Sequence, residues 1–386
     1  MRSFVSDVAR DIKPSGIRKF FDLVLTMEGD VISLGVGEPD FDTPWSISKA
    51  AITSIEKGMT MYTSNRGLPE LCGLLSEDFK NRYGVEYDPK SEIIFTTGVS
   101  EGLDIAMRAV VNPGDEVLVV DPCFVSYPPE VYLAGGVPKA LPCRAEDQFK
   151  ITPESLMEHI TPKTKVLMMN FPNNPTGGVM DKDDLKAISD IIIDHDLLVI
   201  SDEVYSELSY DLKHTATASI DGLFERTITL NGFSKAYAMT GWRLGYLCAP
   251  KEICDAALKI HQYAMMSAPT ASQFAAIEAL KSGEEAKDEM VAEYRIRRNL
   301  FVKGLNDIGL SCHLPQGAFY AFPSIESTGL SDEEFAERLL KEQQVAVVPG
   351  SAFGESGKGH VRTCYAVDRP RLTEAVRRIG EFVESL

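Results

Sequence analysis

Short apolar runs alternate with amphipathic stretches through the middle of the chain. Six runs are rich in β-branched and aliphatic residues, and we expect them to be strands: 93–97, 116–120, 165–170, 197–201, 227–230 and 243–248. Two of the stretches between them, 101–111 and 183–195, repeat their apolar positions with helical spacing. The strand runs are continuously apolar, which is typical of strands covered on both faces. The pattern predicts an α/β domain with a mostly parallel central sheet and helices on both faces.

The pattern changes after about residue 280. The following elements are expected there: a long charged helix over 284–308, a helix over 332–343, a short strand over 345–348, and a last helix from 369 to the end. Residues 1–41 do not fit the α/β alternation either. We therefore expect a large α/β domain over 46–280 and a smaller α+β domain made of 1–45 and 281–386.

Composition narrows the class of protein. The chain has 386 residues, of which 44% are hydrophobic and 25% charged, so it can bury two ordinary globular cores. Its net charge of −18 disfavours a nucleic-acid or anionic-membrane surface, because such surfaces need clustered Lys and Arg. No apolar run reaches the ~20 residues that span a bilayer and no signal-peptide pattern is seen, so we expect a cytoplasmic protein. The seven cysteines form no CxxC pair and the six histidines no HExxH motif, so no metal site is expected.

One segment carries the most chemical information. Lys235, in Asn231-Gly-Phe-Ser-Lys235, follows the predicted strand 227–230, and Arg243 stands eight positions later. A lysine that can form an imine and an arginine that can hold a dianion are what a pyridoxal phosphate (PLP) enzyme needs from its protein. Taken alone, the two residues are equally well explained as surface cations that happen to be close in sequence.

Other polar residues follow predicted strands, and the strand ends of an open α/β sheet lie along one crevice. Ser100 stands where strand 93–97 gives way to a helix, so free N–H groups and the helix dipole can bind an anion there. A plain helix N-cap would use the same residue. Asp202 follows strand 197–201, and a protonated pyridine nitrogen would be a partner for its carboxylate. Tyr205 could then donate to the ring's phenolate oxygen, although an N-cap Asp beside a packed Tyr explains the pair as well.

Three further residues each have a structural and a functional interpretation. Asn174 lies in Asn173-Asn-Pro-Thr-Gly177, where Asn and Gly are also ordinary turn residues. Phe124 could lie against a flat ring or be a core aromatic. Arg362 stands among apolar residues of a β-type segment and needs an anion, which a substrate carboxylate or a structural ion pair would supply.

Together these motifs resemble the fold-type-I PLP-dependent aminotransferases of the aspartate/aromatic group. The resemblance runs nearly end to end and is carried by Ile32-Ser-Leu-Gly-Val-Gly-Glu-Pro-Asp-Phe-Asp-Thr-Pro44, Tyr62-Thr-Ser-Asn-Arg-Gly-Leu-Pro-Glu-Leu71, Asn173-Asn-Pro-Thr-Gly177, Ser201-Asp-Glu-Val-Tyr205, the lysine segment, and Val345-Ala-Val-Val-Pro-Gly-Ser-Ala-Phe-Gly354. Ser15-Gly-Ile-Arg-Lys-Phe20 and Asn231-Gly-Phe-Ser-Lys235 are most similar to archaeal aromatic aminotransferases. The resemblance implies the PLP-dependent transferase fold of type I, with the smaller domain closing over the active site.

The resemblance also implies roles for the residues around the cofactor. Lys235 would hold PLP covalently and then act as general acid and base. Asp202 would pair with the pyridine nitrogen, and Phe124 would stack on the ring. Tyr205 and Asn174 would bond the ring's phenolate oxygen.

Phosphate and substrate contacts follow from the same resemblance. The phosphate would be held by Val99, Ser100, Arg243 and, from the partner subunit of a homodimer, Tyr62. The substrate would be held by Gly37, Asn174 and Arg362, with Arg362 on the α-carboxylate. The implied reaction is a ping-pong transfer of the α-amino group of an amino acid (aromatic, aspartate or broad) to a 2-oxo acid such as 2-oxoglutarate. Two departures stand out: Gly232 replaces a frequent Ser or Thr, and Ser100 stands where some relatives use Lys to recognise acidic side chains.

Three other functions share some of these sequence features. A β-lyase or related carbon–sulfur lyase or synthase on the same fold would share every PLP motif. A PLP-dependent DNA-binding regulator lacks support, because there is no helix-turn-helix extension and the net charge is −18. A nucleotide-binding loop at 350–359 is disfavoured, because Ala352 stands where the first glycine is needed and Gly359 where Ser or Thr is needed.

Overall fold

The structure, a computed structural model, describes residues 4–14, 16–17 and 29–386. Its main feature is a sheet of seven strands in the order β2-β8-β7-β6-β5-β3-β4. The strands are β2 (Ile93–Thr96), β3 (Glu116–Asp121), β4 (Val137–Pro142), β5 (Thr164–Asn170), β6 (Leu198–Asp202), β7 (Thr227–Gly232) and β8 (Gly245–Cys248). Neighbouring strands are parallel except β8, which is antiparallel to both β7 and β2. The predicted mostly parallel sheet is therefore confirmed.

The predicted strands need three corrections. Strand β4 was not predicted, because it is an edge strand whose exposed residues interrupt the apolar pattern. The predicted strand 243–248 begins only at Gly245, since Arg243 adopts the left-handed conformation with φ of 53°. The predicted strand 345–348 is divided into β10 (Val345–Ala346) and β11 (Val348–Pro349), which belong to different sheets.

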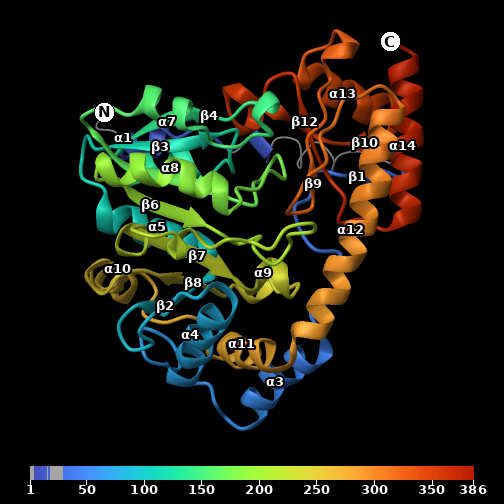
Figure 1. The fold of residues 1–386 in the computed structure, drawn as a ribbon. Coiled ribbons are helices and arrows are strands. Elements are labelled where there is room, and N and C mark those ends of the chain that lie inside the picture. The colour runs from blue at the N-terminus through green and yellow to red at the C-terminus, as the bar shows by residue number, and fades with distance from the viewer. Residues whose placement is uncertain (1–3, 15, 18–28) are drawn as a thin grey trace.

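The helices lie around the sheet and along one side of the molecule (Figure 1). Their bounds are α1 (Asp7–Asp11), α3 (Trp45–Glu56), α4 (Pro69–Tyr83), α5 (Gly98–Val110), α6 (Tyr127–Leu133), α7 (Pro153–His159), α8 (Lys182–Asp194), α9 (Phe233–Ala236), α10 (Lys251–Ala264), α11 (Thr270–Ser282), α12 (Glu284–Asp307), α13 (Asp332–Gln343) and α14 (Arg369–Glu384). The predicted helix 101–111 begins earlier, at Gly98. Among the described residues no helix is long and apolar enough to cross a membrane.

Alternate residues of the sheet pack into two different cores. Ile94 of β2 and Leu247 of β8 belong to a core that includes α5, α8 and α10. Phe95 and Tyr246, one position away on the same strands, belong to a core that includes α3, α4 and α11. Because successive side chains of a strand point to opposite faces, this part of the sheet is covered on both faces.

A third core joins the C-terminal part of the chain to the segment around residue 32. Helices α12, α13 and α14 pack there together with two small sheets. One sheet pairs β1 (Ile32–Ser33) with β10 in parallel, and the other has the order β11-β12-β9, with β9 at Tyr320–Ala321 and β12 at Val361–Cys364. In Figure 1, α12 leads from the side of α11 to this group of elements. The assignment of domains 46–280 and 1–45 with 281–386 stays a prediction.

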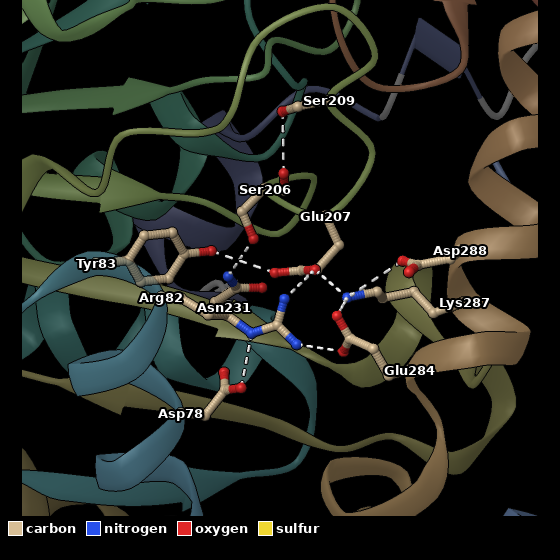
Figure 2. Close-up of polar contacts among 10 residues, drawn as sticks. All are labelled: Asp78, Arg82, Tyr83, Ser206, Glu207, Ser209, Asn231, Glu284, Lys287 and Asp288. Carbon is tan, nitrogen blue, oxygen red and sulfur yellow. Dashed lines mark hydrogen bonds and ion pairs between the residues drawn. The ribbon is translucent and has the colours of Figure 1, made fainter.

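Charged side chains join α4, the segment after β6 and the first turn of α12 (Figure 2). Glu207 accepts hydrogen bonds from Arg82 (3.0 Å) and Lys287 (2.6 Å) through Oε2 and from Tyr83 (3.2 Å) through Oε1. Glu284 also contacts both Arg82 and Lys287. The cluster connects the beginning of α12 to α4 and to the segment that follows β6.

Candidate active site

A cavity of about 320 Å³ lies beside the C-terminal ends of the central strands. Every candidate residue from the sequence except Tyr62 lines it: Gly37, Val99, Ser100, Phe124, Asn174, Asp202, Tyr205, Lys235, Arg243 and Arg362. Strands β2, β5, β6 and β7 run in the same direction, so the loops that follow them meet at one edge of the sheet. Gly37 and Arg362 reach the cavity from the segment after β1 and from β12.

Lys235 lies half-buried in α9, directly after β7. Its Nζ donates a 2.7 Å hydrogen bond to the carbonyl oxygen of Gly37. Burial, assisted by the cations of Arg362 and Arg243, lowers the pKa of Lys235 to about 8 against the opposing effects of Cys364 and Glu38. At neutral pH the neutral fraction of the Lys235 amine is therefore larger than that of an ordinary lysine. The neutral amine is the nucleophilic form.

Asp202 is the last residue of β6, and its carboxylate is buried. Oδ2 accepts a 2.8 Å hydrogen bond from the Tyr127 hydroxyl, and Oδ1 accepts one of 3.1 Å from the Val204 N–H. Burial raises the pKa of Asp202 to about 6, and these two bonds partly oppose the effect. No helix starts at Asp202, so the alternative of a plain helix cap is wrong. A buried carboxylate without an ion-pair partner among the described residues suits a cationic ring nitrogen in the cavity.

The start of α5 and the side chain of Arg243 form a cradle for an anion. The N-cap residue Thr97 makes no side-chain cap hydrogen bond. Gly98 has φ of +76°, and a Cβ built there would lie 2.6 Å from Nη2 of Arg243, so the guanidinium approaches the helix start closely. Ser100 is the third residue of α5, which makes the plain N-cap interpretation wrong and leaves its exposed hydroxyl free to face a ligand. A cation and the N–H groups of a helix start together suit a phosphate dianion.

Arg362 is a buried cation whose guanidinium still has an unused donor. It donates to Oδ1 of Asn174 (3.0 Å) and to the carbonyl oxygen of Gly35 (2.5 Å), and its Nε has no partner. Its central carbon lies 4.6 Å from the ring centre of Tyr320 and 4.8 Å from that of Phe353. Within the described part of the chain it pairs with no carboxylate, so the alternative of a structural ion pair is wrong. The donors suit a carboxylate ligand.

The remaining candidates complete the walls of the cavity. The hydroxyls of Tyr205 and Tyr320 are hydrogen-bonded at 2.8 Å. The ring of Phe124 lies edge-on to that of Tyr127, with centres 5.7 Å apart. Asn174 is buried and is fixed by its bonds to Arg362 and to Oδ1 of Asn170.

Two positions differ from the rest. Tyr62 is 82% exposed and does not line the cavity of its own chain. Gly232 has no room for the Ser or Thr of many relatives, because a Cβ there would lie 2.9 Å from both the Gly245 Cα and the Leu244 carbonyl oxygen. Most of the segment 15–20, which carried part of the resemblance, lies outside the described residues, although Ile17 lines the cavity.

The cavity residues that the sequence analysis did not single out include two tyrosines, Tyr127 and Tyr320. Tyr127 stands in the segment that follows β3, and this position after a strand end was a signal that could have been used. Tyr320 lies in Gly317-Ala-Phe-Tyr320, more than a hundred positions from Tyr205, and no local pattern joins the two.

Comparisons with known proteins show the family of the chain. Residues 29–379 match the family model "Aminotransferase class I and II". The chain is 53% identical over 383 residues to a "Putative aminotransferase YugH" from Bacillus subtilis, with 99% of each chain covered. It is 47% identical over 382 residues to an aspartate aminotransferase of Pyrococcus abyssi, with 98% of each chain covered. The crystal structure of an aromatic aminotransferase from Pyrococcus horikoshii superimposes with a TM-score of 0.91 at 46% identity, covering 96% of this chain and 99% of that one.

Proposed function

The chain belongs to the class I and II aminotransferase family, and on that premise we propose that the cavity around Lys235 is its transamination site, with a preference for aromatic amino donors. The family is PLP-dependent, its fold is the type I transferase fold, and its members move amino groups between amino acids and 2-oxo acids. The predictions of fold, cofactor and transaminase activity are thus confirmed, and a lyase is not favoured.

The residues present fit the cofactor at three points: a lysine with a lowered pKa, a buried carboxylate with no ion-pair partner among the described residues, and an anion cradle. PLP, when bound, draws electrons away from the substrate's α-carbon and carries the amino group between the two half-reactions. Val99, Ser100 and Arg243 would hold its phosphate. Asp202 would pair with its pyridine nitrogen, and Phe124 would lie against its ring.

Substrate handling follows from the other wall of the cavity. The α-carboxylate of the substrate binds Arg362, with the unused Nε and the neighbouring Asn174 and Gly37 completing the subsite. The amine of Lys235 takes the α-proton and returns it within the same site, because its lowered pKa keeps a neutral fraction available. Tyr205 would donate to the phenolate oxygen of the cofactor.

The juxtaposition of Lys235 with Asp202 and the anion cradle in one cavity carries this assignment. The variant Lys235→Ala should keep the circular dichroism of the wild type yet lose turnover and the visible absorbance of the covalently bound cofactor. Normal turnover in Lys235→Ala would contradict the assignment of this cavity as the transamination site.

The aromatic preference is tested separately. The absence of Lys at position 100 argues against a dedicated receptor for acidic side chains there. The test is to measure kcat/KM for a panel of amino donors to 2-oxoglutarate: Asp, Ala, Tyr, Phe, Trp, Glu and Lys. We expect kcat/KM for Tyr and Phe to exceed that for Asp. The reverse order would contradict the aromatic preference but not the transaminase activity.

We also propose a homodimer in which Tyr62 reaches the phosphate of the partner subunit. The support is an exposed set of large apolar side chains: Trp45, Ile52, Ile55, Met61, Tyr62 and Tyr263. Hydrogen bonds from Thr270 to the Met61 carbonyl and from Asn65 to the Met266 carbonyl fix the loops that bear part of this set. Mixing inactive Lys235→Ala with inactive Tyr62→Ala should restore activity through hybrid dimers, because one hybrid site then holds both native residues. If hybrid dimers are shown to form and activity is not restored, Tyr62 does not contribute to the active site of the partner subunit.

We also propose a two-domain organisation and a cytoplasmic location. Residues 1–45 with 281–386 form a smaller domain that closes over the large one, which is supported by the origin of Gly37 and Arg362 outside residues 46–280. Small-angle scattering with and without a bound substrate analogue should show a smaller radius of gyration in the bound form. A cytoplasmic location is tested by cell fractionation.

A further inference from the structure

We propose that Tyr320 is a positioning residue of this site, which orients the Tyr205 hydroxyl and seats the Arg362 guanidinium. The inference rests on the proposed roles of Tyr205 and Arg362. Tyr320 is buried, belongs to β9 and lines the cavity.

The hydroxyl of Tyr320 determines which way the Tyr205 proton points. The two hydroxyls lie 2.8 Å apart, and burial raises the pKa of both phenols, so both are protonated at neutral pH. Each phenol has a single proton. If Tyr205 donates its proton to the phenolate oxygen of the cofactor, the proton between the two tyrosines must come from Tyr320. A donated bond of this kind polarises the Tyr205 O–H and strengthens it as a donor.

The ring of Tyr320 supports the carboxylate-binding arginine. In the sheet, Tyr320 pairs with Cys364 of β12, two positions from Arg362, so the side chains of Tyr320 and Arg362 project from the same face. The guanidinium carbon lies 4.6 Å from the ring centre of Tyr320, and Phe353 covers the guanidinium at 4.8 Å. Two aromatic rings this close to a guanidinium limit its reorientation, which keeps its free donor directed at the ligand.

The same hydroxyl occupies the space above Gly37. A Cβ built on Gly37 would lie 2.2 Å from the Tyr320 oxygen, so the close approach requires glycine there. The carbonyl of Gly37 is the acceptor for Nζ of Lys235. Tyr320 therefore touches the phenol, the arginine and the glycine, three groups that come from separate parts of the chain.

Two substitutions separate the hydroxyl from the ring. Tyr320→Phe removes only the hydroxyl, and Tyr320→Leu removes the aromatic face as well. Tyr365→Phe is the matched control for the hydroxyl, because Tyr365 bonds the Ala318 carbonyl in the same core without reaching the cavity. Phe335→Leu is the matched control for the ring, because Phe335 packs on Phe382 in that core.

The first measurement is a pH titration of the visible absorbance of the bound cofactor, which gives the pKa of its linkage to Lys235. A hydrogen bond to the phenolate oxygen lowers this pKa, so a weakened Tyr205 donor should raise it. We expect Tyr320→Phe to raise the pKa by about 0.5 to 1 and Tyr365→Phe to leave it as in wild type. A pKa that is unchanged or lower in Tyr320→Phe would overturn the hydroxyl's role.

The second measurement is the dissociation constant of 3-phenylpropionate, a monocarboxylate without an amino group, by calorimetry on the holoenzyme. Tyr320→Phe should bind it within about twofold of wild type, whereas Tyr320→Leu should bind it about tenfold more weakly. Equal binding by Tyr320→Leu and Phe335→Leu would overturn the ring's role. A wild-type protein without cofactor absorbance would instead overturn the proposed function, so the two failures are distinct.

Discussion

The hydroxyl of Tyr127 donates a 2.8 Å hydrogen bond to Oδ2 of Asp202, which joins the first residue of α6 to the last residue of β6. Burial pushes the carboxyl toward its neutral form, and this bond favours the charged form. Only a charged Asp202 can hold a protonated ring nitrogen as an ion pair. With Asp202 in its proposed role, Tyr127 would act on the cofactor through this carboxylate.

Tyr127→Phe should raise the pKa of Asp202 above about 6 and weaken cofactor binding. The loss of one hydrogen bond to a charged group corresponds to roughly a tenfold higher dissociation constant for PLP. Absorbance titration of the cofactor-free protein with PLP at pH 7 measures it. Tyr132→Phe, on the same helix but with its hydroxyl directed to Asp11, should bind PLP as wild type does. Equal affinity of the two variants would mean that Tyr127 has no part in cofactor binding.

Gly98→Ala should abolish tight cofactor binding. The residue has φ of +76°, and the added methyl would meet the Arg243 guanidinium at 2.6 Å. Gly84→Ala is a close control, because Gly84 has φ of +70° and nothing lies within 4 Å of its Cβ position. Both variants should lose about 1 kcal/mol of unfolding free energy from backbone strain. Only Gly98→Ala should raise the PLP dissociation constant, by about a hundredfold or more, since the anion cradle is lost. A similar rise in Gly84→Ala would show that the effect is one of general stability.

Glu207→Gln should destabilise the protein much more than Glu284→Gln. Glu207 bonds both Arg82 and Lys287, and the side chain of Lys287 is only 3% exposed. Loss of the Glu207 charge removes a main counterion of that buried ammonium, which costs about 2 to 3 kcal/mol. The Glu284 side chain is 57% exposed, so its replacement should cost less than about 1 kcal/mol. Urea unfolding at pH 7 compares the two variants, and equal losses would contradict the central place of Glu207 in Figure 2.

The sequence predicts those parts of the fold whose signal is local. Continuous apolar runs predicted β5, β6 and β7 to within a few residues, and helix α13 has the predicted bounds. Strand β4 was missed because its half-exposed edge has no such run. Residues 345–348 were predicted as one strand, since nothing local records that the chain passes from one small sheet to another at Val347.

The residues of the candidate site also fall into those that the sequence predicts and those that it does not. The residues at strand ends, such as Asp202 and Lys235, could be singled out because parallel strands bring their C-terminal ends to one edge. Tyr320 could not, because its contacts with Tyr205 and Arg362 depend on how β9 and β12 pair with each other and meet the segment after β6. Gly232 was noted as a departure from relatives, but the reason, the close packing of its backbone on Gly245, is visible only in three dimensions.

Lys235 should make the stability of the cofactor-free protein depend on pH. Burial lowers its folded-state pKa to about 8 from the ordinary lysine value of 10.5. Between these values the unfolded chain binds more protons than the folded one, so unfolding free energy rises with pH across this window. Below pH 8 both states are protonated, and the burial penalty is constant and at its largest. For a half-buried lysine this penalty is on the order of 2 kcal/mol.

Lys235→Met removes the penalty, so cofactor-free Lys235→Met should be about 2 kcal/mol more stable than cofactor-free wild type at pH 7.5. The difference should shrink as pH rises from 8 to 10.5, because wild-type Lys235 then loses its proton in the folded state first. Urea unfolding of both proteins at half-unit pH intervals measures the difference in their unfolding free energies. The contributions of all other titrating groups are the same in both proteins and cancel in this difference. The exposed Lys303, replaced in Lys303→Met, serves as the control, and its difference from wild type should stay constant within about 0.5 kcal/mol. A difference for Lys235→Met that stays constant or grows across this window would mean that the folded protein does not hold Lys235 in an environment that disfavours its charge.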